Sequence, residues 1–284
     1  MWSGTLGHSK QIEQLSRALK EGKLAHAILF SGIDGIGKKR VALGLAKSLN
    51  GKIADRFHPD CHEIAPTGQT IKVDVIRELK QKIYFHPLEG RAKVVIIDNA
   101  DAMTEAAANA LLKILEEPPS VTYFILISSK PAKLLPTIRS RCQKLEFSPL
   151  NEETLTQKLI QDGVDKKEAT LRAKISGGSL KAAIELDIPL FEKIESQMEA
   201  LSLTAKPSQI FSLSEAWMEE DEKIPSILNI LHHLWHQKIL ETRDVGAEQK
   251  QLNQWQAIQN ASRGLEAYAN KQLLLENLLF TLAQ

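Results

Sequence analysis

A glycine-rich loop that ends in two lysines is the segment of this sequence best equipped for chemistry. Residues 32–39 read Gly-Ile-Asp-Gly-Ile-Gly-Lys-Lys, directly after a short apolar run, and the segment that follows has apolar residues at helical spacing. Between a strand and a helix, such a loop offers backbone N–H groups and a helix N-terminus to phosphates, and its lysine reaches the outer phosphates. The sequence therefore predicts a phosphate-binding loop, with an ordinary strand-to-helix turn as the alternative. The predicted contributors are Gly32, Gly35, Gly37 and Lys38.

Two positions in this predicted site carry the wrong side chain for ATP hydrolysis. Lys39 stands where such a loop has a Ser or Thr whose hydroxyl holds Mg²⁺, and an ammonium group repels a metal cation. An apolar run ends in Asp98, the layout that places an acid beside the metal, but Asn99 follows where a glutamate base is expected. Because an amide is no comparable base, we predict a degenerate nucleotide site without a metal. ATP or ADP could remain bound there without hydrolysis, and no cofactor is required.

The first half of the chain alternates apolar runs with segments of helical spacing. Continuous apolar strands alternating with helices indicate a parallel sheet that is covered on both faces, an α/β fold. Asp74 and Thr104 are the expected N-caps of two helices, and Pro118-Pro119 must stop the second. The expected strands are 27–31, 94–97, 122–128 and 144–147, and the expected helices are 39–49, 73–84 and the segment that follows residue 104.

Strand signals stop after Pro149, so the sequence predicts three domains. Residues 1–149 are expected to form the α/β nucleotide-binding-like domain, 150–205 a small helical domain, and 206–284 an all-α domain. The segment Ala205-Lys-Pro-Ser208 is a candidate linker between the last two. Apolar residues recur at helical spacing from residue 224 to the C-terminal end, which is typical of a helical bundle.

Composition narrows the function classes without selecting one. The 284 residues carry a net charge of +1, so the overall charge attracts neither nucleic acid nor a membrane surface. Cys61 and Cys142 form no disulfide framework. No signal peptide and no apolar run of about 20 residues is visible, which predicts a cytoplasmic protein that does not span a membrane. His58 and His62 flank Cys61, but these three groups are too few for a tetrahedral zinc site. The histidines around residue 233 lack the carboxylate that a metalloprotease-like motif needs, so no metal site is predicted.

Three further motifs carry a resemblance to a known family. They are the run from Asp98 to Pro119, the tripeptide Ser140-Arg141-Cys142 and the tripeptide His58-Pro59-Asp60. They resemble segments of bacterial clamp-loader subunits, the delta-prime and gamma/tau proteins of the AAA+ class. The resemblance is specific over residues 1–149 and weaker beyond. It implies an AAA+ P-loop domain, a small helical lid domain and an all-α C-terminal collar domain. The four-cysteine zinc module of the family is missing here.

The resemblance assigns roles to three side chains. Arg141 matches the arginine that projects into the ATP site of a neighbouring subunit, an arginine finger acting in trans; a surface arginine paired with an acid is the alternative, and Arg139 is a second candidate. Ser129, or its neighbour Ser128, matches the residue that senses the terminal phosphate, although a turn role is equally compatible. Lys181 stands where an arginine of the lid reaches the nucleotide, and it keeps the charge without the bidentate geometry.

Together these observations predict a non-hydrolysing delta-prime-type scaffold subunit of the bacterial DNA polymerase III clamp loader, which acts in DNA replication. Lys39 and Asn99 favour this branch because gamma/tau subunits hydrolyse ATP. The implied partners are gamma/tau motor subunits and a delta subunit in a hetero-oligomeric ring, the sliding clamp, and primed DNA through the complex. Two alternatives stay open: an ATP-hydrolysing motor subunit of the gamma/tau type, and an AAA+-like adaptor outside replication.

Overall fold

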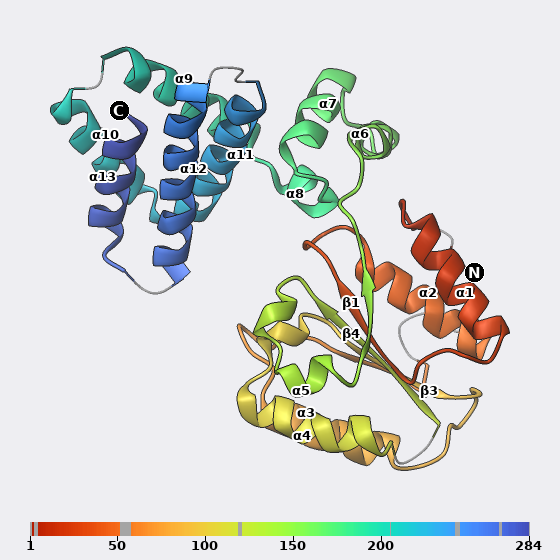
Figure 1. Cartoon of the computed structure of the whole chain (residues 1–284). Helices are drawn as coiled ribbons and strands as arrows, with labels where there is room; N and C mark the ends of the chain where they lie inside the picture. Colours follow the sequence, from red (N-terminus) through yellow and green to blue (C-terminus); the bar gives the residue numbers. More distant parts are fainter. Residues whose placement is uncertain are drawn as a thin grey trace. The chain divides into compact units, whose positions relative to one another are not determined.

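A five-stranded parallel sheet lies at the centre of the N-terminal part of the chain (Figure 1). The computed structural model describes all residues except 1, 3, 4, 52–57, 119, 120, 205, 242–244, 267, 268 and 284. The chain divides into two compact units, Met1–Ile184 and Glu185–Gln284.

The sheet confirms the predicted α/β fold. Its strand order is β2-β3-β4-β1-β5, and every pairing is parallel. All residues of β1 and β3 are buried, as expected for strands covered on both faces. The sequence missed β2, a short strand at the edge of the sheet that is not a continuous apolar run. The strands are β1 Ala27–Ser31, β2 Cys61–Ile64, β3 Lys93–Ile97, β4 Thr122–Ser128 and β5 Gln143–Glu146.

Helices cover both faces of this sheet. Successive residues of β1 point to opposite faces of the sheet. Leu29 packs in the apolar cluster with α3, α4 and α5, and Phe30 packs in the cluster with α1 and α2 (Figure 1). The helices are α1 Ser9–Lys20, α2 Lys38–Asn50, α3 Val73–Ile83, α4 Glu105–Glu116 and the short α5 Pro136–Arg139. Short 3₁₀ turns lie at Ala100–Ala102 and Pro131–Lys133.

The two predicted helix caps have different outcomes. Thr104 caps α4, since its hydroxyl accepts a hydrogen bond from the backbone N–H of Ala107 at 3.2 Å. The prediction for Asp74 is wrong: the N-cap position of α3 is Lys72, and Asp74 lies within the first turn, where its charge still complements the helix dipole. Helix α4 ends at Glu116, before the two prolines, of which Pro119 lies outside the described residues.

Three short helices complete the first unit. They are α6 Glu152–Gln161, α7 Lys166–Ile175 and α8 Leu180–Glu185. They share a small apolar cluster of Leu159, Ala169 and Ala183. The turn before α8 is fixed to the sheet domain because the N–H of Leu150 donates to the carbonyl of Gly178 at 3.0 Å.

Among its described residues the second unit contains helices and short connections but no strand, as predicted for the C-terminal domain. Its helices are α9 Ile188–Thr204, α10 Pro207–Glu219, α11 Ile224–Glu241, α12 Val245–Glu266 and α13 Lys271–Leu282, with a 3₁₀ turn at Asp221–Lys223. The indole N–H of Trp235 donates to Gln254 at 2.9 Å, and Gln254 donates to the carbonyl of Leu282 at 3.1 Å, which ties three of these helices together.

The boundary between the compact units differs from the predicted start of the last domain. The sequence placed that start at residue 206, whereas the second compact unit begins at Glu185. The difference is α9, which packs against α11 of the second unit although the sequence grouped it with the small helical domain. Of the candidate linker, Ala205 lies outside the described residues and Pro207 begins α10. No helix among the described residues is long and apolar enough to cross a bilayer.

Asp60, from the His58-Pro59-Asp60 motif, anchors the loop between α3 and β3. Its side chain is fully buried and accepts hydrogen bonds from the backbone N–H groups of Leu88, Glu89 and Gly90 at 2.8, 2.9 and 2.7 Å. Burial acts to raise the pKa of this carboxyl, but the three backbone hydrogen bonds outweigh it, so the pKa lies below its ordinary value. The charged form of Asp60 therefore stabilises the fold.

We expect Asp60→Asn to lower the free energy of unfolding by roughly 2–3 kcal/mol at pH 7, because charge-assisted hydrogen bonds to a buried group are lost. Since the folded pKa is depressed, this contribution is complete above the unfolded pKa of about 4 and is lost as pH falls through the folded pKa. Denaturant unfolding of both proteins at pH 7, 5 and below 4 measures it. Asp74→Asn is the control, since Asp74 is exposed and its ion pair is with Arg77, which is also exposed. A difference in the free energy of unfolding between wild type and Asp60→Asn that does not shrink as the pH falls would contradict this role of Asp60.

Candidate functional site

The predicted phosphate-binding loop joins the end of β1 to the start of α2. Gly37 takes the N-cap position of α2, and Lys38 is the first residue of the helix. Gly32 could not be replaced by a larger residue without movement, since an added Cβ would lie 2.4 Å from the carbonyl oxygen of Phe147. The strand-loop-helix geometry predicted for this segment is therefore present.

Lys38 folds back on the loop that contains it. Its ammonium group donates to the carbonyl oxygens of Gly32 and Ile33 at 2.6 and 2.5 Å, and the residue is only 5% exposed. Burial lowers the pKa of Lys38, and the nearby carboxylates, Asp34 foremost, act in the opposite direction. The lysine that would contact outer phosphates is thus retained, and here it stabilises the loop itself.

Lys39 lies between two carboxylates on neighbouring strand ends. Its ammonium nitrogen is 3.1 Å from Glu63 at β2 and 3.6 Å from Asp98, the residue that follows β3. The sequence did not predict Glu63, because the short strand that carries it was not recognised. The position where a Ser or Thr hydroxyl and an acid would hold Mg²⁺ therefore contains a fixed positive charge. The residues present do not fit this metal ion.

Asn99 and the polar residues at the end of β4 lie near this acid. Asn99 adopts a left-handed conformation with φ of 49°, and its backbone N–H donates to Asp98 at 3.1 Å. Asp101 accepts a hydrogen bond from the Ser128 hydroxyl at 2.5 Å and another from the Ser129 backbone N–H at 3.2 Å. Of the two serines, the hydroxyl of Ser128 is therefore already engaged by Asp101, while Ser129 contributes its main chain.

Helix α8 contacts the phosphate-binding loop directly. The backbone N–H groups of Leu180 and Lys181 both point to the carbonyl oxygen of Gly35, at 3.1 and 3.4 Å. The Lys181 ammonium group donates to Asp34 at 2.9 Å. Although burial acts to raise the pKa of Asp34, this hydrogen bond and the charge of Lys181 bring it below its ordinary value. Lys181, predicted from the resemblance to reach a nucleotide, thus pairs with an acid of the loop.

His8 is a further contact to the loop that the sequence did not indicate. Its Nε2 lies 2.7 Å from the carbonyl oxygen of Ile36, and its ring meets the ring of Phe147 edge-on at a centroid distance of 5.0 Å. Because a carbonyl oxygen only accepts, His8 carries its proton on Nε2 in this contact. Burial and the charge of Lys38 lower the pKa of His8, which favours the neutral ring.

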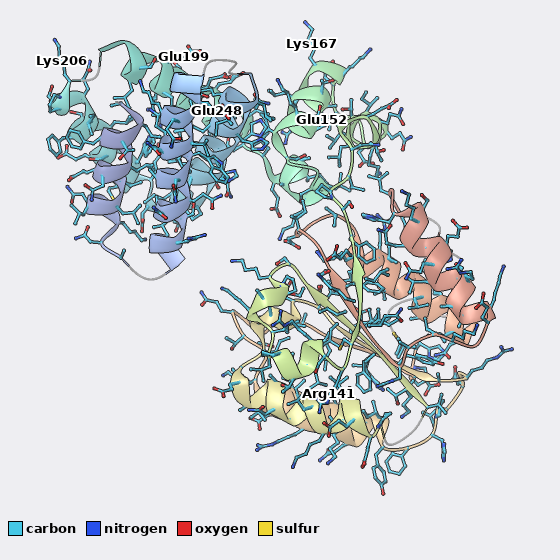
Figure 2. All side chains as sticks on the ribbon, in the orientation of Figure 1. Arg141, Glu152, Lys167, Glu199, Lys206 and Glu248 are labelled. Atoms are coloured by element: carbon cyan, nitrogen blue, oxygen red, sulfur yellow. The ribbon has the colours of Figure 1, made fainter. Side chains whose placement is uncertain are left out.

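Arg141 lies on the face of the sheet that α4 and α5 cover (Figure 2). Its guanidinium donates through Nε and Nη2 to the carboxylate of Glu116, with the Nε contact at 2.8 Å, and through Nη1 to the carbonyl oxygen of Thr137 at 2.9 Å. The side chain remains 36% exposed. Within this chain Arg141 is thus a surface arginine paired with an acid. Its role toward another subunit stays a prediction.

The described part of the chain contains no cluster of three His, Cys, Asp or Glu side chains arranged to hold a metal ion. Cys61 and Cys142 are free thiols, and burial raises the pKa of each to about 11. At neutral pH both are therefore protonated and poor ligands.

The charge of Lys39 predicts that Mg²⁺ adds nothing to the interaction of this chain with ATP. The thermal midpoint with ATP should be the same in Mg²⁺ and in EDTA, because the Lys39 ammonium already lies beside both Asp98 and Glu63 and repels a metal ion there. Lys39→Thr removes the ammonium and supplies a hydroxyl, so its midpoint with ATP should rise on addition of Mg²⁺. Lys47→Thr, an exposed change on the same helix, serves as the control. A Mg²⁺-dependent rise in the wild type is the result that contradicts this assignment.

The contact between α8 and the loop predicts a different cost for two glycine substitutions. Gly35 and Gly37 both have positive φ, but an added Cβ meets Lys181 Cβ at 2.4 Å only at Gly35, and meets nothing within 4 Å at Gly37. We expect Gly35→Ala to destabilise the protein by about 1–2 kcal/mol more than Gly37→Ala, the cost of overpacking added to backbone strain. Hydrogen exchange at the Leu180 amide should accelerate in Gly35→Ala. Equal stability and equal exchange in the two variants would show that α8 does not pack on the loop.

Comparison with known proteins agrees with this geometry. A family model described as DNA polymerase III, delta subunit, matches residues 7–151. The DNA polymerase III subunit delta-prime of Bacillus subtilis is 31% identical over 312 aligned positions, which cover 95% of this chain and 94% of that protein. The delta-prime subunit of Escherichia coli is 34% identical over 61% of this chain and 58% of its own length.

Relatives of the gamma/tau type and a solved structure extend the comparison. The tau subunit of Escherichia coli is 29% identical over 80% of this chain and 40% of its own length. The structure of a DNA polymerase III gamma subunit-related protein from Thermotoga maritima covers 96% of this chain and 98% of its own, with a TM-score of 0.51 at 23% identity, which supports the fold. From the family model and the near full-length Bacillus relative, the chain belongs to the delta-prime family of DNA polymerase III clamp-loader subunits.

Proposed function

We propose that this chain is a clamp-loader subunit that does not hydrolyse ATP and that supplies Arg141 to the ATP site of a neighbouring subunit. The observation that carries the proposal is the Lys39 ammonium group between Glu63 and Asp98, at 3.1 and 3.6 Å. It holds the position that a metal ion needs, and Asn99 provides no base beside it. A chain with these two features retains the fold of an ATPase for a purpose other than its own turnover.

Arg141 supports the second half of the proposal. Its guanidinium is permanently charged and planar, which suits it to the oxygens of a phosphate group. Its recorded hydrogen bonds go to α4 and α5, and none goes to the phosphate-binding loop of its own chain. An arginine that is part-exposed and separate from its own nucleotide loop is available to a site on another chain.

The partners follow from the family. We propose a hetero-oligomeric ring with gamma/tau motor subunits and a delta subunit, located in the cytoplasm, which loads a sliding clamp on primed DNA. The helical second unit, Glu185–Gln284, would contribute the collar that joins the subunits. Support comes from the relatives, which are named as delta-prime and gamma/tau subunits of DNA polymerase III. The phosphate-binding loop would hold ATP or ADP only as a static ligand, and no cofactor is required.

The proposal predicts that Arg141→Ala lowers ATP hydrolysis by the motor subunits when the complex is assembled. Arginine fingers contribute roughly 10³- to 10⁵-fold to the rate at the site they serve, so hydrolysis at the adjoining site should nearly stop while other sites continue. The measurement is steady-state phosphate release by complexes reconstituted with wild-type or variant chain. Arg139→Ala is measured beside it, because Arg139, two residues away, is the second candidate for the finger and should leave hydrolysis unchanged if Arg141 is the finger.

Two outcomes would count against the proposal. One is an unchanged kcat with Arg141→Ala in a complex shown by gel filtration to be complete. The other is an equal loss with Arg139→Ala, which would indicate a general disturbance of the segment.

A further inference from the structure

We infer that Glu116 is a positioning residue, which holds the Arg141 guanidinium in the orientation that a neighbouring nucleotide requires. This inference rests on the proposed function of Arg141 in trans. It is carried by the contact between the two side chains, in which both Nε and Nη2 of Arg141 donate to one oxygen of Glu116, Oε1.

The hydrogen bonds of Arg141 leave part of its donor set free. A guanidinium has five N–H groups. Two donate to Glu116 and one donates to the carbonyl oxygen of Thr137. The remaining two N–H groups, one on each terminal nitrogen, have no acceptor among the described residues, and the side chain is 36% exposed. Two such donors on one planar group match two oxygens of a phosphate.

Both partners of Arg141 are fixed to the core. Glu116 is the last residue of α4, where the preceding Leu115 is 1% exposed and Leu111 is fully buried. Thr137 belongs to α5 and is followed by Ile138, which is also fully buried. The guanidinium is therefore held by two hydrogen bonds to α4 and one to α5, both of them anchored helices. The negative end of the α4 dipole adds to the attraction at Glu116.

The same geometry argues against a role for Glu116 as a latch that withholds the arginine. A latch would have to release Arg141 before a phosphate could bind. Here the two free N–H groups can meet a phosphate while the contact with Glu116 persists. The pair is also part-exposed on both sides, 36% and 49%, so solvent screens it and it is too weak to withhold the arginine. Glu116 thus restricts orientation without removing the arginine from use.

The test compares Glu116→Ala and Glu116→Gln in the reconstituted complex. We expect Glu116→Ala to lower kcat at the site served by Arg141 by roughly threefold to tenfold, the cost of a less well oriented catalytic group, with KM for ATP little changed. Glu116→Gln keeps an acceptor oxygen and should recover part of the loss. In an Arg141→Ala background, Glu116→Ala should have no further effect on kcat.

Glu117→Ala is the matched control, since Glu117 is the adjacent exposed acid and the three hydrogen bonds of Arg141 go to Glu116 and Thr137. An unchanged or increased kcat in Glu116→Ala overturns the inference. So does a result in which Glu116→Ala lowers kcat by the same factor whether or not Arg141 is present. Thermal unfolding of the isolated chain identifies a variant that fails to fold, in which case Glu116→Gln decides. A normal kcat in Arg141→Ala alone shows instead that the proposed function has failed.

Discussion

The ammonium group of Lys39 is the charge on which the rest of this site depends. Two carboxylates, Glu63 and Asp98, converge where the strands β2 and β3 end side by side, and such a pair needs a cation nearby to limit their repulsion. In a metal-dependent site the cation comes with the nucleotide. Here the protein carries the cation covalently on α2, so each of the two carboxylates has a positive partner without a ligand.

The contacts around the phosphate-binding loop are consistent with this self-contained state. Lys38 donates to carbonyl oxygens of the loop, Lys181 pairs with Asp34, and His8 reaches the carbonyl of Ile36. Each of these three side chains therefore has a partner within the same unit. The loop then acts as a structural junction that joins the N-terminal segment, the sheet and α8. Arg141 lies apart from these contacts, because its hydrogen bonds go to a different pair of helices.

The sequence predicted the parts of this structure that depend on local patterns. The apolar strands at 27–31 and 94–97 and the glycine loop follow from residue type and spacing, and the structure contains all three. The strand β2 was not predicted because it is short and lies at an edge, and with it Glu63 was missed. The helix caps show the same limit. Thr104 caps α4 as predicted, whereas Asp74 is the second residue of α3 and not its N-cap.

The pairings missed by the sequence join residues that are distant along the chain. Glu116 and Arg141 are brought together only when α4 and α5 pack on the same face of the sheet, and no local spacing encodes that contact. The contact of His8 with Ile36 has the same origin. The compact unit that begins at Glu185 includes α9 because the partner of α9 is α11, which lies later in the chain than the linker-like segment.

The most direct test of the central claim is phosphate release by the isolated chain in ATP and Mg²⁺, followed over hours beside the Lys38→Ala variant. If the Lys39 charge occupies the metal position, the two proteins should release phosphate at the same background rate. Steady turnover by the wild type that disappears in Lys38→Ala would contradict the account and place this chain among the hydrolysing motor subunits.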